Sequence, residues 1–252
     1  MSRQDALGAA AQAIWTPYCG VAPGPGEILV RWNLDPWLLA VAAAAVACWI
    51  WARRRVALDG RLIGLAALAL AIGFVSPLCA LSSALFSARV VHHALLVAVA
   101  APLLAFGLPA SGRGPSLAGA AGLHAAVFWL WHAPAPYAWA LGHDGVYWLM
   151  QASLLGTALL MWRAVRRCCG LAAAAALLAT MVQMGLLGAL ITFAPAPLYA
   201  PHLTTTWAWG LSPLADQQLA GLIMWAPMAL AYLLAALAIV GRSLSSPRAE
   251  AA

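Results

Sequence analysis

Histidine and methionine are the side chains in this sequence best suited to bind a metal. His92 and His93 are adjacent, and a later apolar segment contains both His124 and His132. Imidazole and thioether groups are ligands that suit Cu(I). The sequence therefore allows a copper site wherever the fold brings these residues together.

Helical spacing indicates which of these histidines share a face. Arg89 and His93 are four residues apart and project from one face of a helix, whereas His92 points about 100° away. His124 and His132 are eight apart and lie roughly on one face, with His124 deeper in its segment. We expect His93 and His132 to form a shared site. Simple helix–helix hydrogen bonds are the alternative, particularly for His124.

Methionines form a second set of candidate ligands. Met181 and Met184 share one helical face, and Met224 and Met228 share a face of the last apolar segment. These thioethers could extend a copper path. They could equally be flexible apolar packing residues, and the sequence leaves both interpretations open.

The remaining reactive residues are less specific. Cys19 and Cys79 both fall on the predicted outer side, where they could pair or bind metal. Asp216, Gln217 and Gln218 open the last apolar segment as a polar cluster, in which the acid could simply favour a helix N-terminus. No CxxC, HExxH, P-loop, GxGxxG or GxSxG motif is present.

The composition shows what surrounds these residues. Of the 252 residues, 65% are hydrophobic and 8% are charged, whereas soluble domains carry about 25% charged residues. The net charge of +6 comes from arginines grouped between apolar runs, which is typical of membrane topology and not of a nucleic-acid surface. We therefore predict an all-α, polytopic membrane helix bundle that spans the bilayer and binds no nucleic acid.

Seven apolar runs are long enough to approach the length that crosses a bilayer. Placing Arg53–Arg55 inside puts ten arginines on the cytoplasmic side and three, Arg3, Arg31 and Arg89, outside. This predicts an outer N-terminal segment (1–35), a seven-helix domain (36–241) and a cytoplasmic tail (242–252). The predicted spans are 36–52, 62–82, 88–108, 116–133, 145–163, 171–193 and 217–241.

Three stretches resemble the bacterial cytochrome c oxidase assembly factors of the CtaG type, which are seven-helix membrane proteins. They are HHALLVAVAAPLLAFGLP (92–109), FWLWHAPAPY (128–137), and the stretch from Pro197-Leu198-Tyr199 to GLSPLADQQLAGLIMWAP (210–227). The resemblance covers about 33 to 241 in matching order and spacing.

By position, the resemblance selects a small set of polar residues: His93, His132, Asp216, Gln217 and Gln218. The chain also departs from the family pattern. Arg89 stands where a histidine is usual, and Met150-Gln151 stands where a Glu-His pair is usual. Two expected ligands are thus missing, and we hypothesise that Arg89 pairs with Asp216 near the outer mouth of the bundle.

The resemblance implies a non-enzymatic assembly factor in the bacterial cytoplasmic (inner) membrane. It would act as a chaperone in building the respiratory chain, assisting copper insertion into a haem–copper cytochrome c oxidase at the periplasmic face. His93 and His132 would be ligands, with help from His92 and nearby methionines, and a copper chaperone is a further possible partner. Two alternatives stay open: a metal-free accessory subunit or scaffold of the oxidase, and a haem-binding or haem-modifying membrane protein.

Overall fold

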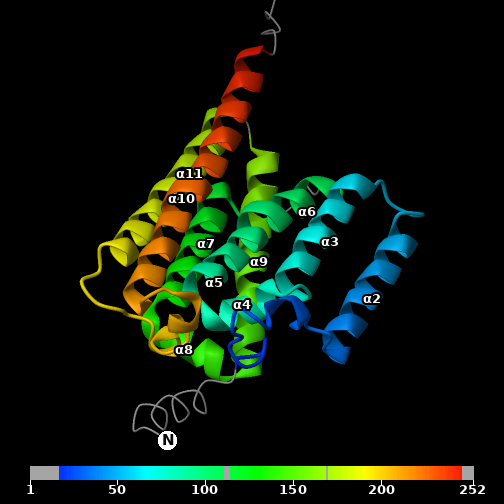
Figure 1. Cartoon of the computed structure of the whole chain (residues 1–252). Helices are drawn as coiled ribbons and strands as arrows, with labels where there is room; N and C mark the ends of the chain where they lie inside the picture. Colours follow the sequence, from blue (N-terminus) through cyan, green and yellow to red (C-terminus); the bar gives the residue numbers. More distant parts are fainter. Residues whose placement is uncertain (1–16, 111–113, 169, 246–252) are drawn as a thin grey trace, which may run out of the picture.

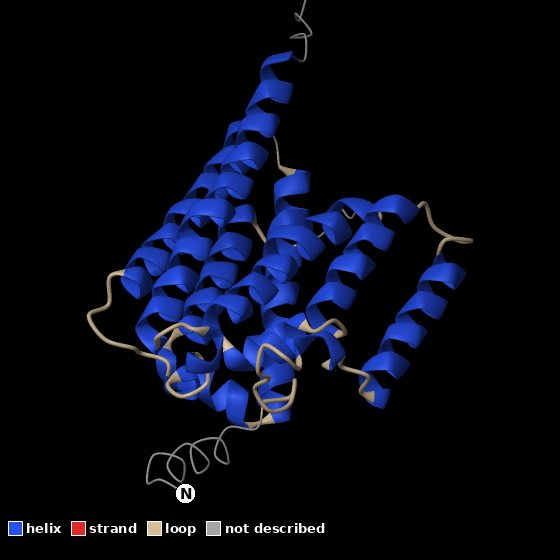
Figure 2. Cartoon of the chain, viewed as in Figure 1, coloured by secondary structure: helices blue, strands red, loops and turns tan. Residues whose placement is uncertain are grey.

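The computed structural model describes residues 17–110, 114–168 and 170–245, and across these ranges the chain forms helices and loops without any strand (Figures 1 and 2). The all-α prediction is confirmed. Arg3, Arg113, Cys169 and Arg248 lie outside the described residues.

The α-helices are α2 (Pro36–Ala52), α3 (Gly60–Phe74), α4 (Leu78–Ala84), α5 (Phe86–Ala94), α6 (Ala101–Gly107), α7 (Leu117–His132), α8 (Pro134–Gly142), α9 (Asp144–Arg167), α10 (Gly170–Thr192) and α11 (Pro213–Ser245). Shorter pieces are η1 (Ile28–Val30), η2 (Leu95–Ala100), η3 (Ala200–His202) and η4 (Trp207–Trp209).

Four stretches of the described chain are long and apolar enough to cross a membrane on their own. They are Phe86–Gly107, Asp144–Arg167, Gly170–Thr192 and Pro213–Ser245. The pair α3 and α4 forms a fifth if its 43° bend belongs to one span, and α2 is apolar but shorter. Each of the seven predicted runs is largely helical, whereas the number of crossings stays a prediction.

Two of the predicted spans are irregular because of proline. The 62–82 run breaks after Phe74, where Pro77 precedes the short helix α4. The third run widens into a π-helix, η2, just before Pro102. Pro102 has no N–H to bond to the preceding turn, and Val97 instead accepts a hydrogen bond from the Trp162 indole N–H at 3.1 Å.

Close approach of small residues joins α10 and α11. A Cβ placed on Gly188 of α10 would lie 2.9 Å from the backbone oxygen of Gly221 on α11. Small residues at such crossings let helix backbones pack tightly where lipid removes the usual hydrophobic driving force. These two helices run side by side and form one edge of the bundle (Figure 1).

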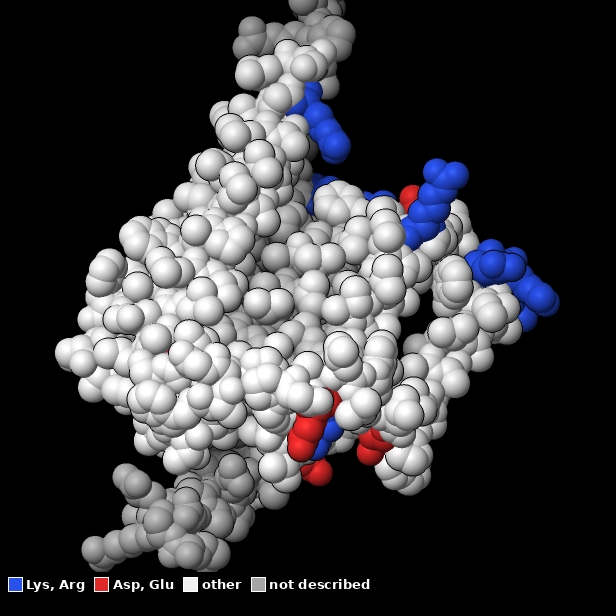
Figure 3. Space-filling model, in the orientation of Figure 1, with Lys and Arg blue, Asp and Glu red and all other residues white. Residues whose placement is uncertain are grey.

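The two ends of the bundle differ in charge and in covalent chemistry. Arginines gather at the end where α11 finishes, and most visible acidic groups lie at the opposite end (Figure 3). We call the latter, which holds α4, α8 and the start of α11, the lower end. There Cys19 and Cys79 form a disulfide with a Cα–Cα distance of 5.3 Å. The sequence left open whether these cysteines pair, and the structure pairs them.

Candidate functional site

His93 on α5 and His132 on α7 meet inside the bundle. Their ring centroids are 5.3 Å apart and the rings stand edge to face. The two side chains are 1% and 2% exposed. The predicted pairing of these two histidines across helices is therefore present in the fold.

Local hydrogen bonds fix the proton position of the histidines on α7. His132 Nδ1 lies 2.7 Å from the Phe128 carbonyl oxygen, which can only accept, so Nδ1 must carry the proton. The Thr157 hydroxyl already donates to the Ser153 carbonyl, so it accepts from Nδ1 of His124. In both rings Nε2 is buried and has no hydrogen-bond partner within the described chain. Metal-binding histidines are oriented by this kind of Nδ1–H bond to a second group.

His92 lies next to the pair but faces another surface. Its ring centroid is 6.1 Å from that of His93, and it packs edge-on against Phe74 of α3 at 4.8 Å. A Cβ added to Gly73 would come within 3.1 Å of the His92 ring, so the ring packs closely against the α3 backbone. The helical spacing correctly predicted that the two adjacent histidines point in different directions.

Arg89 is fully buried one turn before His93. Its guanidinium carbon lies 5.3 Å from the centre of the Tyr147 ring on α9, a cation–π contact. Its nitrogens make no hydrogen bond of normal geometry within the described chain, although the hydroxyls of Tyr137 and Tyr147 lie within reach of its charge. Gln151, one turn beyond Tyr147, is also buried, and its amide makes no hydrogen bond of normal geometry within the described residues. An ionisable group at such a depth is costly and is usually functional.

The hypothesis that Arg89 pairs with Asp216 is wrong. Asp216 accepts hydrogen bonds from the backbone N–H groups of Phe86 at 2.7 Å and Ser87 at 3.2 Å, and from the Ser87 hydroxyl. Its carboxylate therefore caps the N-terminus of α5 from a neighbouring helix. The N–H groups at this helix start attract the acid more effectively than the side chain one turn further along.

The two glutamines beside Asp216 differ in role. Gln217 accepts a hydrogen bond from the Leu198 N–H at 2.7 Å and donates to the Ile191 carbonyl at 3.1 Å. It thus ties the loop between α10 and α11 to both helices. Gln218 is partly buried, and its backbone carbonyl lies 3.5 Å from the Thr192 hydroxyl. These contacts explain the positions structurally, without a ligand.

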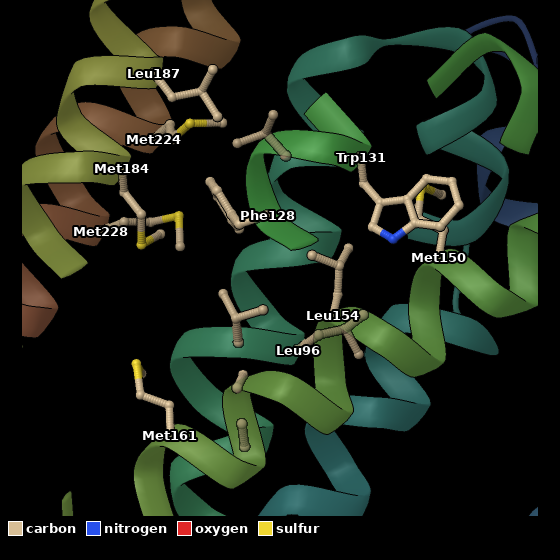
Figure 4. Packing of buried hydrophobic residues seen from close by; sticks show 14 of the residues in the cluster. Leu96, Phe128, Trp131, Met150, Leu154, Met161, Met184, Leu187, Met224 and Met228 are labelled. Carbon is tan, nitrogen blue, oxygen red and sulfur yellow. The ribbon is translucent and has the colours of Figure 1, made fainter. Parts of the chain in front are cut away.

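The methionines lie in the apolar core. Met184 on α10 and Met224 and Met228 on α11 are buried in the region that Phe128 faces (Figure 4). Met181 is only partly buried at the edge of the same core. The Phe128 ring also lies beside that of His132, with ring centroids 4.3 Å apart and the ring planes tilted by 31°. Phe128 thus belongs to the core that contains the methionines and is also a neighbour of His132.

An aromatic cluster closes the lower end and was not anticipated from the sequence. Phe86 stacks on Tyr199 at 3.7 Å, and the Tyr137 hydroxyl bonds to His202 Nε2 at 2.7 Å. Tyr199 also donates to the His132 carbonyl at 2.8 Å. Burial, followed by the charge of Arg89, lowers the pKa of His202 to about 3, so this ring is neutral at pH 7. The Pro197-Leu198-Tyr199 motif was the sequence feature that could have indicated this cluster, because Tyr199 is the residue that contacts His132.

Comparison with known proteins decides the family. A family described as cytochrome c oxidase caa3 assembly factor, Caa3_CtaG, matches residues 115–246, slightly more than half of the chain. The chain belongs to this family. No curated protein and no solved structure matches it. The resemblance drawn from sequence motifs is thus confirmed.

The Caa3_CtaG match includes His132, Asp216 and Gln217, whereas Arg89 and His93 precede it. The described residues contain no group of three or more histidine, cysteine, aspartate or glutamate side chains arranged to hold a metal ion. Two neutral imidazoles with unpartnered nitrogens fit a soft, low-coordinate ion such as Cu(I).

Proposed function

We propose that this assembly factor receives Cu(I) between His93 and His132 and passes it to a cytochrome c oxidase without catalysing a reaction. The observation that carries the proposal is the unsatisfied imidazole pair. Neither nitrogen of His93 nor Nε2 of His132 has a partner in the described chain. Buried polar groups without partners are rare in native proteins and call for an explanation, and a transiently bound cation supplies one.

Arg89 suits a site that releases its ion. Its fixed positive charge lies one helical turn from His93 and weakens the binding of any cation there. A carrier needs moderate affinity, since a site that binds too tightly cannot transfer. The arginine in place of a histidine therefore favours delivery over storage.

We infer that the site opens toward the periplasm of a bacterial cytoplasmic membrane, with seven crossings in total. The arginines at the upper end support this orientation, because positively charged loops stay in the cytoplasm. The disulfide between Cys19 and Cys79 supports it independently, since disulfides persist in oxidising compartments. The copper would come from a chaperone or another donor on that side, and the oxidase subunits would receive it.

Competition with a chromogenic Cu(I) chelator tests the proposal on full-length protein in detergent. We expect one bound Cu(I), and an affinity at least about tenfold lower in His93→Ala and in His132→Ala, because even groups behind the ligands contribute that much. His143→Ala is the matched control, since His143 is exposed at the same end. Wild-type protein that takes no Cu(I) from the chelator contradicts the proposal.

One observation favours a second candidate, a metal-free accessory subunit of the oxidase. Arg89 is a permanent cation beside the histidines, and it would suit a site that never binds metal. Stoichiometric co-purification with mature oxidase, together with no copper binding, would establish this role. A haem-binding role would instead give a Soret absorbance band in the purified protein.

A further inference from the structure

Helix α2 stands apart from the rest of the bundle. None of its residues is buried, and its side chains Val41, Val46 and Ile50 are between 40% and 67% exposed. It is held mainly at its two ends, and an open gap separates it from α3 (Figures 1 and 3). The neighbouring helix α3 also exposes Leu65 and Leu68. Something apolar must fill this gap in the membrane.

A basic cavity opens where the upper ends of α2 and α3 meet α6. Its volume is about 1030 Å³, and its lining includes Trp49, Arg53, Asp59, Arg61 and Arg166. Its lining also includes apolar side chains, among them Trp49 of α2. The cavity therefore offers both cationic and apolar groups to a ligand.

Two of the lining arginines are available to a ligand. Asp59 uses its carboxylate to accept the backbone N–H groups of Arg61 and Leu62 at the start of α3. Arg166 donates to the Ala105 and Leu108 carbonyls at the end of α6. The guanidinium groups of Arg53 and Arg61 form no ion pair within the described chain, whose salt bridge, Arg31–Glu27, lies at the lower end.

Trp49 gives an independent indication of a missing partner. Its indole N–H is buried but has no hydrogen-bond acceptor within the described chain. The residue also lines the cavity, with Arg53 lying 5.9 Å from its ring centre. An indole N–H without an acceptor, next to two arginines that form no ion pair within the described chain, points to a ligand with negatively charged oxygens.

We propose that this cavity and the gap between α2 and α3 form a binding site for an anionic phospholipid of the bilayer. The phosphate lies between Arg53 and Arg61, an ester or phosphate oxygen accepts from Trp49, and the acyl chains fill the space between α2 and α3. Basic clusters at the membrane surface attract anionic lipids by about 1 kcal/mol per residue. The lipid completes the packing of α2, and the site is independent of the copper proposal.

Native mass spectrometry of the full-length protein in detergent tests this site. We expect phosphatidylglycerol to bind more tightly than phosphatidylcholine with the same acyl chains. The double variant Arg53→Gln/Arg61→Gln removes two cations, so its phosphatidylglycerol affinity should fall about thirtyfold. Arg55→Gln is the control, because Arg55 comes from the same turn but stacks on Trp51 outside the cavity.

Four results would overturn the proposal. Equal binding of the two lipids, or an unchanged affinity in the double variant, removes the charge argument. Glycerol 3-phosphate binding as tightly as phosphatidylglycerol means that the site takes a soluble phosphate. A lipid-free dimer that cross-links through Cys48 of α2 means that a second copy covers this helix. If the double variant does not fold, Trp49→Phe replaces it in the same measurement. We expect Trp49→Phe to prefer phosphatidylglycerol over phosphatidylcholine less strongly than the wild type does.

Discussion

At the scale of single residues, Arg89 is the cation next to the proposed copper-binding histidine pair. It is fully buried and permanently charged, and it lies one helical turn from His93. We predict that Arg89→Gln raises Cu(I) affinity about tenfold, because removing a buried like charge several ångströms away lowers the electrostatic cost of a cation. Chelator competition measures the change, and Arg89→Lys should retain the wild-type affinity. An unchanged affinity in Arg89→Gln would show that the two groups do not interact.

Asp216 illustrates a different residue-scale role. Its carboxylate accepts three hydrogen bonds at the start of α5, and an amide cannot reproduce all of them. We predict that Asp216→Asn destabilises the protein by about 1–3 kcal/mol, seen as a lower thermal unfolding temperature in detergent. Asp144→Asn is the control, since Asp144 is exposed in the first turn of α9. Equal losses in the two variants would argue against the capping role.

At the scale of elements, the loop between α10 and α11 depends on a neutral histidine. Tyr137 donates to His202, which in turn bonds the Ala84 carbonyl at 3.3 Å, while Arg89 and Tyr199 complete its surroundings. Since the folded pKa of about 3 is below the ordinary value near 6.5, the unfolded chain takes up the proton first. The stabilisation is complete above about pH 6.5 and is lost as the pH falls toward 3.

This linkage predicts a measurable pH effect. Between pH 6.5 and 5 the His202 contribution should fall by about 1.4 kcal/mol per pH unit. His202→Gln keeps polar contacts but does not titrate, so its unfolding temperature should drop less over this range than that of the wild type. Parallel pH profiles in the two proteins would contradict the buried, neutral state of His202.

Element positions were largely predictable from sequence, whereas their irregularities were not. The length of the apolar runs located each long helix. The helical rotation of about 100° per residue correctly predicted that His92 and His93 point in different directions. The bend at Pro77, the π-segment before Pro102 and the short helix α8 arise from proline and from contacts between distant segments. Asp216 shows the limit most clearly, because its partners Phe86 and Ser87 are about 130 residues away, and no local pattern could identify them.

At the scale of the whole molecule, the orientation can be tested with the native thiol at the upper end. Cys168 is free and exposed just beyond α9. In a Cys48→Ala/Cys169→Ala background, we predict that a membrane-impermeant maleimide labels Cys168 in inside-out vesicles but not in right-side-out ones. A C-terminal tag should show the same sidedness. Labelling from the outer side would reverse the topology and place the histidine pair near the cytoplasm.

Copper delivery to a cytochrome c oxidase is the role proposed for the paired histidines. The most direct test measures copper per haem in the oxidase purified from cells in which this protein is replaced by His93→Ala/His132→Ala or by the control His143→Ala. We predict that the double variant yields oxidase with haem but with markedly less copper, and that added copper in the medium restores part of it. Oxidase with full copper content in cells carrying the double variant at wild-type abundance would contradict the account.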